Sequence, residues 1–237
     1  MNPGVLHITL PGLVLAFIPA AVVLVVLYRW SLGAGTATYA LGRMLLQLVL
    51  IGYVLNFLFA ADQGALVAGA LAVMLIAASS IAVRPVQQRN AGTYGRALAA
   101  IFVGGVPVLW LVTQLVVQIE PWYEPRYVIP LAGMIFASAM NSVSLAAERF
   151  ASERQRRTDP HTALHEAFQA ALIPLINSLF AVGLVSLPGM MTGQILSGID
   201  PLIAVRYQIV VMAMIFGSSG IAAACYLWLA SRLTWAS

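Results

Sequence analysis

Long apolar stretches separated by short polar connections dominate this chain. A helix needs roughly 20 mainly apolar residues to cross a hydrocarbon core about 30 Å thick. Seven stretches approach that length, and one charged residue, Arg43, lies within them. The pattern predicts an all-α, polytopic membrane helix bundle with about seven transmembrane helices, at residues 10–28, 41–60, 66–83, 97–119, 127–147, 171–188 and 207–230.

The arginines between these stretches predict how the bundle is oriented. Cytoplasmic connections of membrane proteins carry an excess of arginine and lysine. Alternate connections of this chain hold ten arginines on one side and two, Arg126 and Arg206, on the other. We therefore predict that the N-terminus lies outside and the C-terminus in the cytoplasm.

The segment GLVSLPGMMTGQILSGIDP, residues 183–201, interrupts the apolar pattern on the predicted outer face. Its glycines and proline favour a re-entrant or broken helix. Irregular backbone at membrane depth needs protein or a water-filled cavity to satisfy its polar groups. The alternative is a tight outer turn whose methionines fill gaps. We expect an outer gate made of Leu187, Pro188, Gly189, Met190, Met191, Thr192 and Gly193.

Composition supports lipid as the solvent and excludes several functions. Hydrophobic residues make up 61% of the 237 positions and charged residues 8%, whereas soluble domains carry about a quarter charged residues. The net charge of +4 comes from arginines spaced between apolar runs, which fits membrane topology better than nucleic-acid binding.

There is no lysine, so the chain lacks the GK[ST] lysine of a nucleotide-binding P-loop. The single cysteine, Cys225, excludes an internal disulfide.

Amide side chains inside the apolar stretches are candidates for a transport path. An amide in hydrocarbon must find a polar partner, so it either joins helices or lines a path. For any single amide, joining helices is the simpler role. The predicted path residues are Gln47, Asn141, Asn177 and Gln208.

A metal site is a further hypothesis for the outer face. The run EPWYEP places Glu120 and Glu124 beside two aromatic residues. Two carboxylates can bind a hard cation, and we add Met190 and Met191 as candidate ligands. The alternative is an interfacial loop whose aromatic residues anchor the headgroups.

The longest cytoplasmic connection, residues 148–170, predicts an amphipathic helix. Asp159 followed by Pro160 is typical of a helix start. The chain then shows apolar residues every four positions, a pattern that suits anionic lipid or a docking partner. His161 and His165 also lie in this helix and could bind a metal together. Because no third ligand accompanies them, we favour the interpretation that both histidines are solvated. The predicted docking residues are Arg154, Arg156, Arg157, Asp159, Leu164 and Phe168.

Intramembrane catalysis is not expected. The run GSSG at residues 217–220 offers serines, but none of the three histidines lies inside an apolar stretch. No Asp or Glu lies there either, so the usual bases for nucleophilic or acid–base chemistry are missing.

Three segments resemble the membrane permeases of the Fet-type ABC exporters, a family that includes a bacterial iron exporter and plant aluminium-tolerance proteins. They are GRMLLQLVLIGYVLNFLFA (42–60), YVIPLAGMIFASAMNSVSL (127–145) and GLVSLPGMMTGQILSGIDPLIAVRYQIVVM (183–212). The resemblance covers roughly residues 41–228.

The resemblance implies one transmembrane permease domain over residues 1–237, in the bacterial inner membrane. Such a subunit has no cofactor or ATP site of its own and works as a homodimer with a cytoplasmic ATPase that uses ATP. The expected function is export of iron or another metal. The alternatives are a permease for an organic substrate such as a nucleotide sugar, and a non-transporting membrane scaffold that recruits a cytoplasmic partner.

Overall fold

The computed structural model describes residues 8–60, 63–86, 90–156 and 158–234. These residues form helices and no strand, apart from an isolated bridge between Val182 and Ser186. The all-helical prediction is therefore confirmed. The chain divides into two compact units, residues 1–62 and 63–237.

The first unit is a helical hairpin. It consists of α1 (Leu10–Leu15), α2 (Ile18–Arg29) and α3 (Ala34–Ala60). Thr9 caps α1 by accepting a hydrogen bond from the Gly12 N–H at 3.3 Å. The turn between α2 and α3 places Ser31 and Gly33 in the left-handed region, with φ of 57° and 75°. This turn lets α3 pack back against α2.

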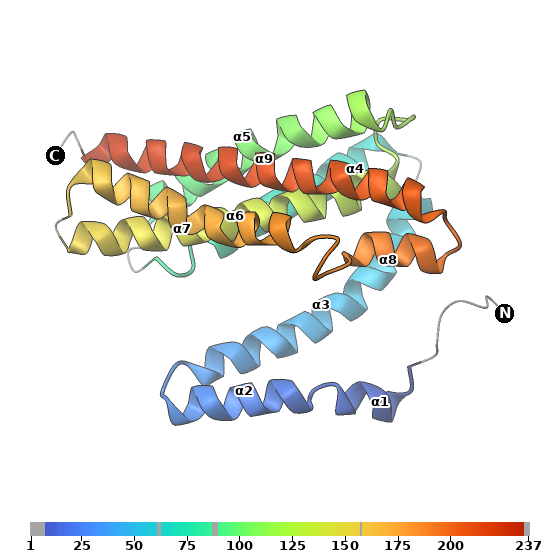
Figure 1. The fold of residues 1–237 in the computed structure, drawn as a ribbon, viewed down its shortest axis with the longest axis horizontal. Coiled ribbons are helices and arrows are strands. Elements are labelled where there is room, and N and C mark those ends of the chain that lie inside the picture. The colour runs from blue at the N-terminus through green and yellow to red at the C-terminus, as the bar shows by residue number, and fades with distance from the viewer. Residues whose placement is uncertain (1–7, 61–62, 87–89, 157, 235–237) are drawn as a thin grey trace. The chain divides into compact units, whose positions relative to one another are not determined.

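The second unit is a bundle in which α5, α6 and α9 form the centre and α4 and α7 pack around them (Figure 1). A π-helix, η1, continues α5, and the short helix α8 precedes α9. The elements are α4 (Gly64–Ala82), α5 (Ala91–Trp110), η1 (Leu111–Val116), α6 (Pro125–Gln155), α7 (Pro160–Ala181), α8 (Gly189–Leu196) and α9 (Pro201–Thr234).

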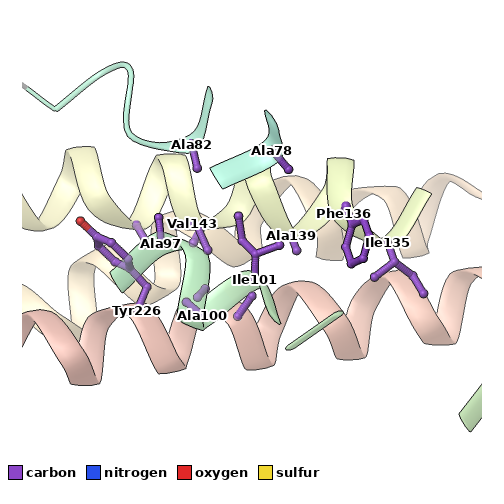
Figure 2. Close-up of a cluster of buried hydrophobic side chains, with 14 of the residues drawn as sticks. Ala78, Ala82, Ala97, Ala100, Ile101, Ile135, Phe136, Ala139, Val143 and Tyr226 are labelled. Carbon is purple, nitrogen blue, oxygen red and sulfur yellow. The ribbon is translucent and has the colours of Figure 1, made fainter. Parts of the chain in front are cut away.

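Small residues make the core of this bundle. Figure 2 shows side chains of α4, α5, α6 and α9 lying together, with Ile101 close to Ala100 and Ala139. The closest approach is at Gly104: a Cβ there would lie 2.6 Å from the Ser218 carbonyl oxygen. Small side chains let membrane helices approach closely enough for backbone to meet backbone.

The predicted number of seven spans is not confirmed. Six helices of the described residues are long and apolar enough to cross a membrane. The predicted stretch 171–188 is not among them, because its helix ends at Ala181 and Val182 starts a turn. The rest of that helix extends back to Pro160 through polar residues that lower its hydropathy.

Helix α7 nevertheless runs along part of the bundle, antiparallel to α6 (Figure 1). Arg149 Nη2 lies 3.5 Å from Glu166 Oε2, which sets the register of the two helices. The 22 residues of α7 correspond to about 33 Å at 1.5 Å per residue. Residues 148–170, predicted as a connection, are thus mostly the end of α6 and the beginning of α7.

The arginines of three connections collect at one end of the second unit. We call this the arginine end; it comprises the end of α4, the beginning of α5, the α6–α7 connection and the end of α9 (Figure 1). The opposite end holds the η1–α6 connection, the turn after α7, and α8. This is the end that the positive-inside rule assigns to the cytoplasm.

Candidate functional site

Two of the four predicted path residues lie on one surface of the second unit. Asn141 of α6 and Asn177 of α7 are both exposed on the single chain. The Arg149–Glu166 contact sets the register, so Asn177 is level with Ser138, about one helical turn from Asn141. Asn141 therefore lies near the middle of the membrane-spanning helix α6, and Asn177 lies in the last turns of α7.

The other two path residues are placed differently. Gln208 of α9 is 6% exposed, and its Oε1 atom is buried with no hydrogen-bond partner among the described residues. A buried polar atom without a partner costs about 1–3 kcal/mol. Gln47 is exposed on α3 of the first unit. The structure thus leaves Asn141 and Asn177 exposed and buries Gln208 inside the bundle.

The predicted gate segment forms the turn after α7 and the first part of α8. Leu187 is 61% exposed, and Pro188 takes the N-cap position of α8. The Thr192 hydroxyl donates to the Pro188 carbonyl at 3.1 Å. Gly189 and Gly193 have open space where a Cβ would be. The segment is a short, glycine-containing helix that adjoins α9.

The candidate metal ligands come from the η1–α6 connection and from α8. Glu120 is exposed, and Glu124 is the partly buried N-cap residue of α6. Met190 lines a small cavity of about 50 Å³ with Met134, Arg126 and Tyr207, among other residues, while Met191 is partly buried. No group of three or more His, Cys, Asp or Glu residues able to hold a metal occurs in the described residues.

Asp159 starts α7 as the sequence predicted. Its carboxylate accepts hydrogen bonds from the backbone N–H groups of His161 and Thr162, at 3.1 and 3.2 Å. The next apolar residues, Leu164 and Phe168, pack against the core. The exposed face of α7 is polar in its first turns, where His165 is accessible to a partner, and largely apolar in its last turns, where Ile173 and Phe180 are exposed.

The arginines near α7 belong to an ion-pair network around Glu153. This carboxylate is 6% exposed and lies 3.0 Å from Arg149 and 3.8 Å from Arg156. The Thr158 hydroxyl also donates to it, at 2.8 Å. Arg154 is directed to a cavity at the arginine end, and Arg157 lies outside the described residues.

An alanine stripe on α7 is a feature that the sequence analysis missed. Ala163, Ala167 and Ala171 are almost completely buried, at 0–1% exposure. Their spacing of four residues places them on one face of the helix. The repeated small residues in the sequence are the signal that predicts a close helix contact.

Comparisons with known proteins give one consistent family. The model of the "Uncharacterised protein family (UPF0014)" matches residues 10–235. A UPF0014 membrane protein of Synechocystis sp. is 39% identical over 86% of this chain and 84% of its own length. The "Probable iron export permease protein FetB" of Escherichia coli is 33% identical over 93% of this chain and 91% of its own length.

A plant protein, "ALUMINUM SENSITIVE 3" of Arabidopsis thaliana, is 30% identical over 85% of this chain and 80% of its own length. No solved structure shows a significant match.

Proposed function

The chain belongs to the uncharacterised family UPF0014 and is a multi-pass protein of the bacterial inner membrane. From this we propose that it is the permease subunit of an ABC exporter. The main support is the 33% identity to a probable iron export permease over 93% of this chain. In this proposal two copies of the chain work with two copies of a separate cytoplasmic ATPase.

The absence of lysine supports a separate ATPase. A P-loop binds nucleotide phosphates through a lysine, and this chain has none. The exposed polar face of α7 and the arginine end are the surfaces that we assign to ATPase docking. Among them, Arg154, Arg156 and Asp159 lie beside the α6–α7 turn.

The continuity of α7 supports a mechanism of alternating access. The helix runs from its cap at Asp159 to Ala181, with Pro174 inside it, and the turn that leads to α8 follows. A push by the ATPase on the beginning of α7 would be transmitted along the helix toward the segment Leu187–Gly193. Such rigid-body shifts of packed helices are a common way to switch a protein between two states.

Iron or another metal ion is the proposed substrate, with Glu120, Glu124, Met190 and Met191 as candidate ligands on the outer side. An organic substrate such as a nucleotide sugar is the second candidate. Its support is the character of the α6–α7 surface, where Asn141 and Asn177 present neutral amides rather than carboxylates. Neutral amides hydrogen-bond to sugars and bases but bind iron weakly.

Inverted membrane vesicles test the proposal, because inversion converts export into uptake. Vesicles containing this chain and the ATPase would be given iron and ATP, and accumulated iron would be measured. We expect ATP-dependent accumulation that is lost when either protein is omitted. An active ATPase complex that moves no iron would reject the metal and leave the organic substrate to be tested in the same vesicles.

A variant distinguishes transport from a scaffold role. The double substitution Asn141→Ala with Asn177→Ala removes both amides without touching the arginine end. A permease would lose transport and still bind the ATPase. Unchanged transport in this variant would contradict the proposed path, and failure to co-purify with any ATPase would contradict the permease proposal itself.

A further inference from the structure

A half-open cavity of about 530 Å³ lies at the arginine end of the second unit. Its wall combines the connection after α4, the first turns of α5, the last turns of α6 and the end of α9. Cavities of roughly 300–1,000 Å³ are the usual size for small-molecule sites. The cavity lies at the opposite end from the predicted gate and contains none of the predicted path residues.

Arg96 of α5 is the first cation on the cavity wall. Its Nη2 atom donates to the Thr93 hydroxyl at 3.1 Å, while its Nε atom is buried with no hydrogen-bond partner among the described residues. A guanidinium carries five N–H donors in a planar fork that matches a phosphate or carboxylate. A buried, charged donor without a partner is costly unless something occupies the site.

Arg154 of α6 is the second cation on the wall. Its neighbours Arg149 and Arg156 are paired with Glu153, and Arg149 also with Glu166. Among the described residues, Arg154 forms no ion pair. The one carboxylate on the cavity wall is that of Glu148, so two arginines face one acid and the wall has a net positive charge.

The other wall residues define what kind of anion fits. Hydroxyl groups come from Thr93, Ser152 and Tyr226, and apolar surface comes from Val86 and Phe150. Hydroxyls and guanidinium groups together are the usual donors to phosphate oxygens. The apolar part of the wall suits the organic portion of a phosphate ester.

We infer that this cavity binds the phosphate group of an organic phosphate, held by Arg96 and Arg154. The phosphate has two possible sources, a soluble phosphate compound or the headgroup of an anionic lipid, since the cavity opens at the end of the membrane-spanning helices. The site shares Arg154 with the proposed ATPase-docking surface, but the cavity is formed by this chain alone, so binding can be tested without the ATPase.

The test uses the purified full-length chain without any ATPase. In a neutral detergent, Tm is measured against inorganic phosphate, with chloride at equal ionic strength as the reference. In a second arm, the chain is reconstituted in phosphatidylcholine vesicles with and without phosphatidylglycerol, and lipid retained after gentle extraction is identified by native mass spectrometry. A ligand that binds the folded state raises Tm in a saturable way.

We expect a saturable rise in Tm with phosphate, or selective retention of phosphatidylglycerol, and the arm that responds identifies the source. Arg96→Gln and Arg154→Gln should each weaken this binding roughly 10-fold or more, as expected for loss of a charged hydrogen-bond donor. Arg206→Gln removes the same charge from an exposed position at the opposite end, and should bind like the wild type.

The inference is overturned if neither arm shows binding, or if both arginine variants bind as well as the wild type. Equal weakening in Arg206→Gln would also overturn it, because the effect would then follow net charge rather than the cavity. If Arg96→Gln does not fold, Arg154→Gln decides the outcome by itself, since its side chain is partly exposed and folding does not depend on burying it.

Discussion

At the scale of single residues, the positions that matter most for helix packing are those where no larger or less polar side chain fits. Gly104 is the clearest case, since a methyl group there would meet the backbone of α9: 2.6 Å from the Ser218 carbonyl oxygen and 2.7 Å from the Ala222 nitrogen. Backbone cannot rotate away as a side chain can, so the helices would have to separate. Gly95, on the same helix, has open space in that direction.

Substituting Gly104→Ala should therefore destabilise the second unit, while Gly95→Ala should not. Overpacking a close contact costs typically about 1–3 kcal/mol, whereas alanine in an open helical position gains about 0.5–1 kcal/mol over glycine. Thermal unfolding in detergent would measure both, and we expect Tm to fall for the first variant and stay or rise for the second. Equal Tm values would show that α5 and α9 are not in backbone contact.

At the scale of elements, α7 and α8 connect the two ends of the bundle. Three buried alanines hold α7 against its neighbours along one face. The chain then leaves the helix at Val182, passes Gly183 at a φ of +83° and re-enters a helix at Gly189. A rigid helix followed by a turn and a short helix is an arrangement that can transmit a displacement.

The substitution Pro188→Ala should reduce transport without unfolding the chain. Proline locks φ near −65°, and Pro188 has a φ of −63° at the start of α8. Alanine permits the same backbone but does not enforce it, so α8 would lose its fixed starting direction. Transport in inverted vesicles and Tm in detergent would be measured together.

A matched control for this gate variant is Pro85→Ala, which removes a proline at the arginine end. We expect transport to fall in Pro188→Ala and to persist in Pro85→Ala. Unchanged transport in Pro188→Ala would contradict a gate at Leu187–Gly193.

At the scale of the whole molecule, the proposed pairing of two copies leads to a prediction about the exposed face of α6. Asn141 lies in the middle of a 31-residue helix and is exposed on the single chain. An amide that faces lipid leaves its polar atoms unsatisfied, so amides in membrane helices usually face another helix or water. A second copy of the chain that covers this face, with a path between the copies, would satisfy both needs.

Cysteine cross-linking tests this arrangement. In a Cys225→Ser background, Asn141→Cys should form a disulfide between copies in native membranes, because a two-fold axis brings equivalent residues together. The control is Ala99→Cys, at an exposed position of α5. Ala99 lies at about the same depth along the bundle as Asn141, because the packing of Gly105 against Phe136 sets the register of α5 and α6. Equal cross-linking of both variants would reject an interface along α6.

The sequence by itself determined the class of the molecule, because that class depends on local quantities. Runs of apolar residues predicted a polytopic helix bundle, and six helices confirm it. The Asp159–Pro160 pair predicted the beginning of α7 because a cap is set by neighbouring residues, and the hydrogen bonds from His161 and Thr162 bear this out. Polar and glycine-rich sequence also predicted the interruption before α9.

Only the tertiary structure decided which side chains meet. Apolar length carried the predicted span on to residue 188, but the helix that begins at Pro160 ends at Ala181. Periodicity marked Leu164 and Phe168 without saying that they pack inward. Asn141, Asn177 and Gln208 look alike in the sequence, yet two are exposed and one is buried. The cavity lined by Arg96 and Arg154 is formed by helices that are far apart in the chain. Local sequence could not predict it, because helix register and close contacts at residues such as Gly104 depend on neighbours that local sequence does not specify.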